Sequence, residues 1–241
     1  MGKLAHTRNQ RLEFLFLPFK VIVSPFRAFK EIAGTPDVKG VGVIAGLILL
    51  ATAGVYYAYS AKIFLLSNGT STSFLSSEMF VDFIASILVE RALLFVENWI
   101  LYGCVLFLVM RVFRQKEGSW RPFFTLVGYA FSITVVQTVI SAVLFASFPA
   151  IQFSTLSSFP PATPEEAAIV TAGIQERWAQ MPTYQALAFF NFPLINIFDV
   201  WFGSLSVIII RAFSEVTWRK AGMIAVTAFS LRVFLKIVLG F

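Results

Sequence analysis

The chain has 241 residues, of which 58% are hydrophobic, 16% aromatic and only 13% charged. Soluble domains carry about 25% charged residues, so this composition excludes a soluble globular protein and predicts a polytopic membrane protein. The formal net charge is +6. A single Cys, Cys104, and a single His, His6, exclude a disulfide framework or a cluster of Cys or His metal ligands within this chain.

The N-terminal residues 1–40 are predicted to form a cytoplasmic segment. Within it, residues 24–34 begin with Ser-Pro and end with Gly, which are typical residues for the start and the end of a helix. Phe26, Phe29 and Ile32 recur every three residues and therefore share one helical face. We predict a short amphipathic helix that lies at the membrane interface on these three side chains.

Five apolar segments are long enough to cross a bilayer as helices, which takes about 20 residues each. They lie at about residues 41–66, 87–110, 123–148, 186–210 and 221–241. The runs are continuous and do not alternate with a period of two, so they indicate helices rather than the strands of a barrel. The predicted fold class is therefore all-α, with a five-helix transmembrane domain over residues 41–241.

Basic residues alternate between the two sides of this arrangement. The N-terminal segment, the loop after the second span and the loop after the fourth span hold seven, four and three Lys or Arg residues, whereas loops 67–86 and 149–188 together hold only Arg177. Because cytoplasmic loops are enriched in Lys and Arg, we predict a cytoplasmic N-terminus and an external C-terminus. The two poorly basic loops are then external.

Both external loops contain a local signal. Asn68-Gly69-Thr70 is a sequon, which makes Asn68 a candidate N-glycosylation site on the side predicted to be external. Thr163-Pro164-Glu165-Glu166 resembles a capping box. It predicts an amphipathic helix from Pro164 to about Gln180, which rests on the membrane, on the protein itself or on a partner.

The spans contain ionisable residues, which are costly inside a bilayer and call for an explanation. With a rise of about 1.5 Å per residue, Glu97, Asp199 and Arg232 fall at similar depths, and Lys236 lies nearer the outer surface. We predict an intramembrane polar network of these four residues. It is interpreted first as a structural ion-pair cluster; a proton or ion path and a lipid-headgroup site at Arg232 and Lys236 are the alternatives.

Gly42 and Gly46 form a small-xxx-small pair in the first span. Such a pair lets a second helix approach closely, and the neighbour could belong to this chain or to another.

No enzyme is predicted. The sequence holds no nucleophile with a nearby base, no phosphate-binding glycine loop and no His-Glu-x-x-His metal motif. Cofactors, metals and nucleic acid are likewise not expected.

Three stretches resemble a known family. They are Ser24-Pro25-Phe26-Arg27-Ala28-Phe29-Lys30-Glu31-Ile32, then Gly118-Ser119-Trp120-Arg121-Pro122-Phe123 with Gly128-Tyr129-Ala130, and finally Trp201 to Leu205 with Trp218-Arg219-Lys220-Ala221. In this order they resemble the Yip family, five-span membrane proteins named for interacting with Ypt/Rab GTPases. The short, basic N-terminal tail departs from the long, often acidic tail of eukaryotic members. We therefore expect a prokaryotic or archaeal member and do not carry over Rab binding.

The expected function is that of a non-catalytic, Yip-like integral membrane protein: a scaffold, a membrane-organising factor or an accessory subunit of a larger complex. The expected partners are membrane lipids and other membrane protein subunits, and the expected location is the cell membrane of a prokaryote, or an endomembrane in a eukaryote. The alternative is a small transporter or channel component that uses Glu97, Asp199 and Arg232. Recruitment of a Rab-like GTPase is a third hypothesis.

Overall fold

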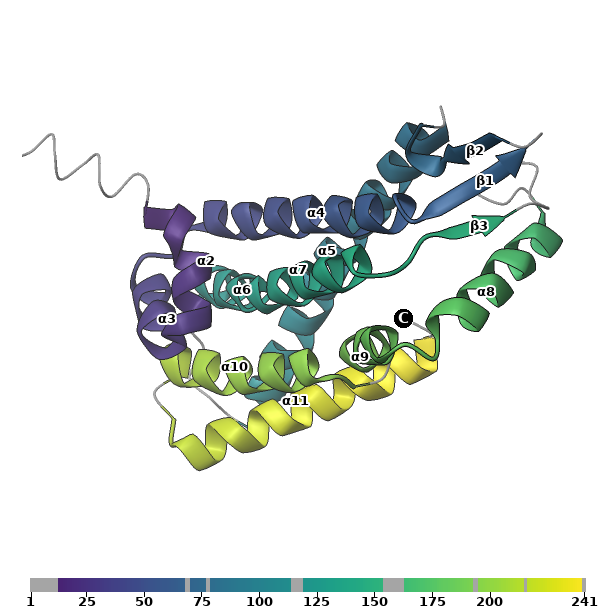
Figure 1. The fold of residues 1–241 in the computed structure, drawn as a ribbon. Coiled ribbons are helices and arrows are strands. Elements are labelled where there is room, and N and C mark those ends of the chain that lie inside the picture. Colours follow the sequence, from purple (N-terminus) through teal and green to yellow (C-terminus); the bar gives the residue numbers. More distant parts are fainter. Residues whose placement is uncertain are drawn as a thin grey trace, which may run out of the picture. The chain divides into compact units, whose positions relative to one another are not determined.

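The computed structural model describes residues 13–67, 70–76, 79–113, 119–153, 163–192, 195–214 and 216–239 (Figure 1). The helices in chain order are α2 (Glu13–Val23), α3 (Pro25–Gly34), α4 (Val38–Ser60), α5 (Met79–Val112), α6 (Trp120–Ala130), α7 (Ser132–Ala146), α8 (Pro164–Trp178), α9 (Pro182–Phe190), α10 (Ile197–Ser214) and α11 (Trp218–Leu239). A 3-10 turn, η1 (Phe74–Ser76), and the strands β1 (Ile63–Ser67), β2 (Thr70–Ser73) and β3 (Ile151–Phe153) complete the described fold. The chain is therefore all-α with one small sheet.

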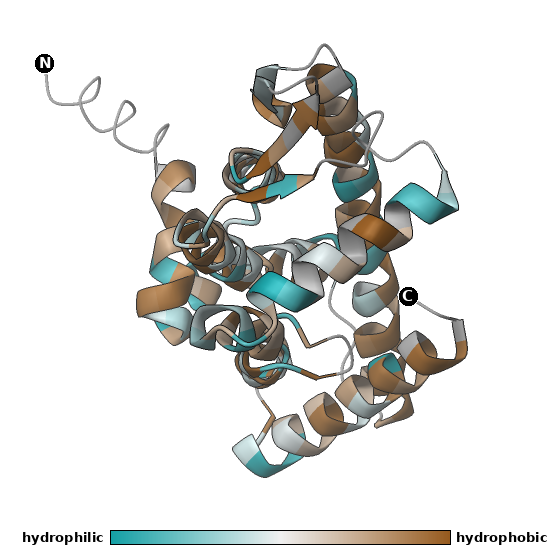
Figure 2. Cartoon of the chain, turned by 45° about the vertical axis from the view of Figure 1, so that its right-hand side comes forward, coloured by the Kyte–Doolittle hydropathy of each residue, from teal (hydrophilic) through white to brown (hydrophobic). Residues whose placement is uncertain are grey.

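Four stretches of the described residues are long and apolar enough to cross a membrane: Val38–Ser60, Phe80–Val112, Trp120–Ala146 and Ile197–Ser214. They correspond to the first four predicted spans. Helix α11 occupies the fifth predicted span and has 22 residues, which is about 33 Å of helix. It is mostly hydrophobic, with hydrophilic interruptions (Figure 2), and it is not among those four stretches. The count of five spans and the orientation remain predictions.

Two of the predicted spans differ from the helices that form. The first was predicted to reach Leu66, but α4 ends at Ser60 and the chain continues as β1. A short apolar run such as Ile63-Phe64-Leu65-Leu66 suits a strand as well as a helix, so its pattern does not distinguish them. The fourth predicted span, 186–210, is interrupted: α9 ends at Phe190 and α10 begins at Ile197.

The chain divides into two compact units, which we describe separately. Unit 1 comprises Met1–Leu47, Leu93–Val135 and Pro193–Phe241. Each of its helices contributes buried apolar side chains, and α3 packs against both α10 and α6. Along α11, Ala221, Ala225 and Ala228 are almost fully buried and form the small-residue face on which α10 packs.

Unit 2 comprises Ile48–Ala92 and Val136–Phe192. Its sheet has the strand order β2-β1-β3, with β1 antiparallel to β2 and parallel to β3. The sheet covers an aromatic core around Trp178, whose side chain is fully buried and whose indole N–H donates to the carbonyl oxygen of Pro149 at 3.1 Å. The predicted external helix is present as α8, and the backbone N–H of Glu166 donates to the Thr163 hydroxyl at 3.2 Å. The sheet was not predicted.

Candidate functional site

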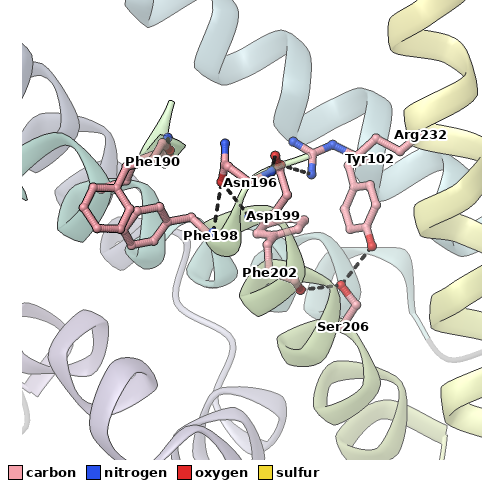
Figure 3. A network of polar contacts seen from close by, with 9 residues as sticks. Tyr102, Phe190, Asn196, Phe198, Asp199, Phe202, Ser206 and Arg232 are labelled. Atoms are coloured by element: carbon pink, nitrogen blue, oxygen red, sulfur yellow. Dashed lines mark hydrogen bonds and ion pairs between the residues drawn. The ribbon is translucent and has the colours of Figure 1, made fainter. Parts of the chain in front are cut away.

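Among the described residues of unit 1, a largely buried pair of opposite charges joins α10 to α11. Arg232 Nη1 donates to Asp199 Oδ1 at 3.2 Å, and the two side chains are only 14% and 12% exposed (Figure 3). Asp199 lies 12 residues before Arg211 and Arg232 lies 14 residues after Trp218. The pair is therefore about 20 Å along the helices from the end at which α10 and α11 are joined.

The second oxygen of Asp199 stabilises the start of α10. Asn196 Oδ1 accepts the backbone N–H groups of Phe198 and Asp199 at 2.9 and 3.1 Å, and Asp199 Oδ2 accepts the backbone N–H of Asn196 at 3.2 Å. This reciprocal pattern is a capping box. It satisfies N–H groups that no helix can satisfy at its own N-terminus, and it places a carboxylate where the helix dipole favours negative charge.

Aromatic rings complete the surroundings of Arg232. Its guanidinium carbon is 5.4 Å from the ring centroid of Tyr102 and 5.1 Å from that of Phe202, which are cation–π distances. Ser206 donates its hydroxyl hydrogen to the Phe202 carbonyl at 3.0 Å, so Tyr102 is the donor in its 2.9 Å bond with Ser206 (Figure 3). Both charges and both hydroxyls are thus engaged by neighbours from α5, α10 and α11.

Of the other members of the predicted polar network, the structure describes the side chain of Glu97. Glu97 lies on α5 with an exposed side chain, and among the described residues it forms no ion pair with Arg232. Lys236 lies on α11, and its side chain is not among those the structure describes. Asn68 also lies outside the described residues. Within the described ranges no three His, Cys, Asp or Glu side chains gather as a metal site would require.

The apolar side chains predicted to lie at the membrane interface are mainly buried within the protein. Helix α3 forms as predicted, but Phe29 and Ile32 are 0% and 1% exposed because this face packs against α6 and α10. Phe26 is half-buried and pairs with the ring of Trp218, with the centroids 5.8 Å apart. The exposed apolar side chains of this segment lie instead on α2, at Phe16, Phe19 and Val23.

Glycines allow α6 to pack closely on its neighbours in unit 1. A Cβ at Gly128 would lie 2.7 Å from Val41 of α4, and one at Gly103 of α5 would lie 2.6 Å from the ring of Phe124. The indole N–H of Trp99 on α5 donates to the Phe124 carbonyl at 2.8 Å. The Gly-Tyr-Ala stretch noted in the sequence therefore marks a place where helices meet at short range.

In unit 2 a second polar cluster closes the end of α9. Gln137 Nε2 donates to the carbonyl oxygen of Phe190 at 3.1 Å and to Asn191 Oδ1 at 3.2 Å. Asn191 Nδ2 donates to Ser141 Oγ and to the carbonyl oxygen of Leu187, both at 3.0 Å. Carbonyl groups at a helix end need such partners in an apolar environment. Where the fourth predicted span is interrupted, side chains therefore form hydrogen bonds with backbone groups at the end of α9 in unit 2 and at the start of α10 in unit 1.

Sequence reasoning missed several residues of the Asp199 site. Asn196 had a readable signal, because Asn-x-x-Asp before an apolar run is a variant of the capping box. Tyr102, Phe202 and Ser206 had none, because an aromatic or serine in an apolar run is usual in any membrane helix. Their roles depend on which faces of α5 and α10 meet.

Replacing Asn196 with Ala is expected to lower the free energy of unfolding by about 1 kcal/mol, because two N–H groups at the start of α10 lose their acceptor. Asn196→Asp, which keeps a capping oxygen, is the control and should cost less. The measurement is unfolding of the purified protein in detergent. An Asn196→Ala variant as stable as the unaltered protein would contradict this role of the cap.

Comparison with known proteins identifies one family. The Yip1 domain model matches residues 19–240, from within α2 to beyond the last described residue of α11. No curated protein and no solved structure matches the chain. The matched region includes the three stretches that resemble the Yip family and all four helical stretches long enough to cross a membrane. The protein is an integral membrane protein that belongs to the Yip1 domain family.

Proposed function

We propose that this protein is a non-catalytic scaffold or accessory subunit that binds another membrane protein through one face of α4. The observation that carries the proposal is the pair Gly42 and Gly46. Both are exposed, and a Cβ built on either would meet no described atom within 4 Å. Two exposed glycines at four-residue spacing form a face of the kind that lets a second membrane helix approach closely.

The contrast within unit 1 supports this assignment. Three other glycines have the space of a Cβ atom occupied by a side chain of this same chain: Gly40, Gly103 and Gly128. Their function is therefore internal packing. Gly42 and Gly46 meet no such neighbour, and glycine in a helix interior costs up to about 1 kcal/mol relative to alanine. A helix from a partner protein would give these two positions the packing role that the other glycines already have.

The alternative, a small transporter or channel component, depends on charges that are free to exchange protons or ions. Asp199 and Arg232 bind each other, and each also has a further contact: the capping bonds for Asp199 and the two rings for Arg232. This arrangement favours a structural clasp between α10 and α11. Glu97, the third residue of that hypothesis, is exposed on α5.

We further propose that the chain crosses a cell membrane five times, with a cytoplasmic N-terminus. The length of α11 is sufficient for a bilayer. Arg219 and Lys220 lie in its first turn, on the predicted cytoplasmic side, and pairing with Asp199 lowers the cost of Arg232 within the bilayer. These features support a fifth span despite the charges in α11.

Replacing Gly42 and Gly46 together with Leu is expected to abolish co-purification of the partner from mild detergent. Leu side chains would fill the face that the partner helix needs, and this chain leaves open space there, so folding should be retained. Gly222→Leu in α11 is the matched control, because Gly222 also has no described atom within 4 Å of its Cβ position. Partner binding that survives the double substitution, or a protein that is a monodisperse monomer without partners in mild detergent, would contradict the proposal.

A further inference from the structure

Two aromatic rings and two cations from three helices form a stack in unit 1. The rings of Phe26 on α3 and Trp218 on α11 have centroids 5.8 Å apart. Lys30 Nζ lies 4.7 Å from the centroid of Phe26, and the guanidinium carbon of Arg211 on α10 lies 5.2 Å from the centroid of Trp218. Each ring therefore holds one cation by a cation–π contact, and the cluster fixes the start of α11 against α3.

The positive charge of this cluster exceeds the negative charge that faces it among the described residues. Glu31 is the acidic residue of α3, and both of its oxygens accept from Lys20 at 3.2 Å. Arg211 donates an N–H to the Val216 carbonyl, which is uncharged. Three more exposed basic residues are neighbours of the stacked rings in sequence: Arg27, Arg219 and Lys220. No described carboxylate forms an ion pair with any of them.

Exposed apolar side chains accompany this positive surface. Trp218 is 53% exposed although it is one of the stacked rings. On α2, which packs against α3, Phe16, Phe19 and Val23 are 62%, 56% and 81% exposed and share one helical face. Leu17 and Val21 bury the opposite face of α2. A helix that buries one apolar face and exposes another, next to unpaired cations, is typical of a segment lying in the headgroup region of a bilayer.

We propose that this cluster binds the phosphate groups of anionic phospholipids. Lys30 and Arg211 are the two cations of the stack, and the exposed side chains of Arg27, Arg219 and Lys220, next to the stacked rings in sequence, add to its positive charge. The phosphate supplies the anionic partner that these basic side chains lack. Trp218 and the exposed face of α2 contact the lipid at the level where the headgroup meets the acyl chains. The apolar surroundings fit a lipid phosphate better than a free one. The site is independent of the α4 face that carries the proposed function.

The test is native mass spectrometry of the full chain reconstituted in nanodiscs of phosphatidylcholine and phosphatidylglycerol in equal parts, with lipid retention counted after release. The double variant Arg27→Gln/Lys30→Gln should retain less phosphatidylglycerol, by roughly five-fold in affinity for each charge removed. Both side chains are exposed, so the variant should fold normally. Phosphatidylcholine retention should not change.

The matched control is Lys39→Gln/Arg121→Gln, which removes the same charge from exposed side chains outside the stack. An equal loss of phosphatidylglycerol in both double variants would overturn the proposal, because it would show attraction to the whole basic surface rather than to this site. A second arm adds inorganic phosphate to the protein in phosphatidylcholine nanodiscs and measures thermal unfolding. Stabilisation by phosphate equal to that by phosphatidylglycerol would also overturn it, since a free anion would then suffice.

Discussion

Replacing Asp199 with Ala is expected to lower the free energy of unfolding by roughly 3–5 kcal/mol, the usual cost of removing one partner from a buried ion pair. The loss leaves Arg232 without its carboxylate in a site where its side chain is only 14% exposed. It also removes the acceptor for the backbone N–H of Asn196 at the start of α10. The measurement is unfolding of the purified protein in detergent or bicelles.

Asp199→Asn separates the two roles of this carboxylate. An amide oxygen can still accept the Asn196 N–H, whereas the charge opposite Arg232 is lost. The double variant Asp199→Asn/Arg232→Gln should be more stable than either single variant, because neither side chain is then an unpaired charge. The coupling energy of the pair is the difference between the effect of the double variant and the sum of the two single effects. Independent, additive effects would show that the two residues do not act as a clasp.

The same variants address the transporter hypothesis. If Asp199 and Arg232 serve only to join α10 and α11, the well-folded double variant should support the same ion flux in proteoliposomes as the unaltered protein. A flux that is present in the unaltered protein and absent from the folded double variant would favour the transporter hypothesis over the scaffold.

Replacing Gly40 with Ala should destabilise the protein by about 1–3 kcal/mol, whereas Gly42→Ala should leave it unchanged or slightly stabilise it. The two positions are one half-turn apart on α4. A Cβ at Gly40 would overlap the phenol of Tyr129, and Tyr129 is 0% exposed, so its ring has little room to move. A Cβ at Gly42 meets nothing within 4 Å. Comparison of the two unfolding curves is the measurement.

Tyr129→Phe provides the complementary variant. The Tyr129 hydroxyl is buried and has no hydrogen-bond partner in the described structure, so its removal should cost little by itself. Combined with Gly40→Ala, it should recover part of the lost stability, because the hydroxyl is among the atoms that a Cβ at Gly40 would overlap. If Gly40→Ala and Gly42→Ala are equally stable, the close approach of α4 and α6 is not important for folding.

The sequence by itself determined the class of the protein, the existence of the helices and the family. Low charge and long apolar runs exclude a soluble fold whatever the packing, because such runs can be buried only in lipid or in other helices. Local residue types were sufficient for α3 and α8, since helix starts and ends depend on a few adjacent residues. Charges placed at similar depths predicted a network of four residues, because charges in a bilayer need partners. The structure forms the Asp199–Arg232 pair of that network.

Only the tertiary structure decided which helix faces are buried by protein and where a predicted helix gives way to a strand. Phe26, Phe29 and Ile32 have the spacing of one apolar face, but spacing does not say whether lipid or protein covers that face; packing on α6 and α10 buries the last two. The strand at Ile63–Ser67 depends on its partner β3, about 90 residues away in the chain. Glycines at 40 and 42 look alike in the sequence, and they differ only because Tyr129 lies against the first and no described atom against the second. Contacts between distant residues, which a single sequence does not contain, are the physical reason for each of these differences.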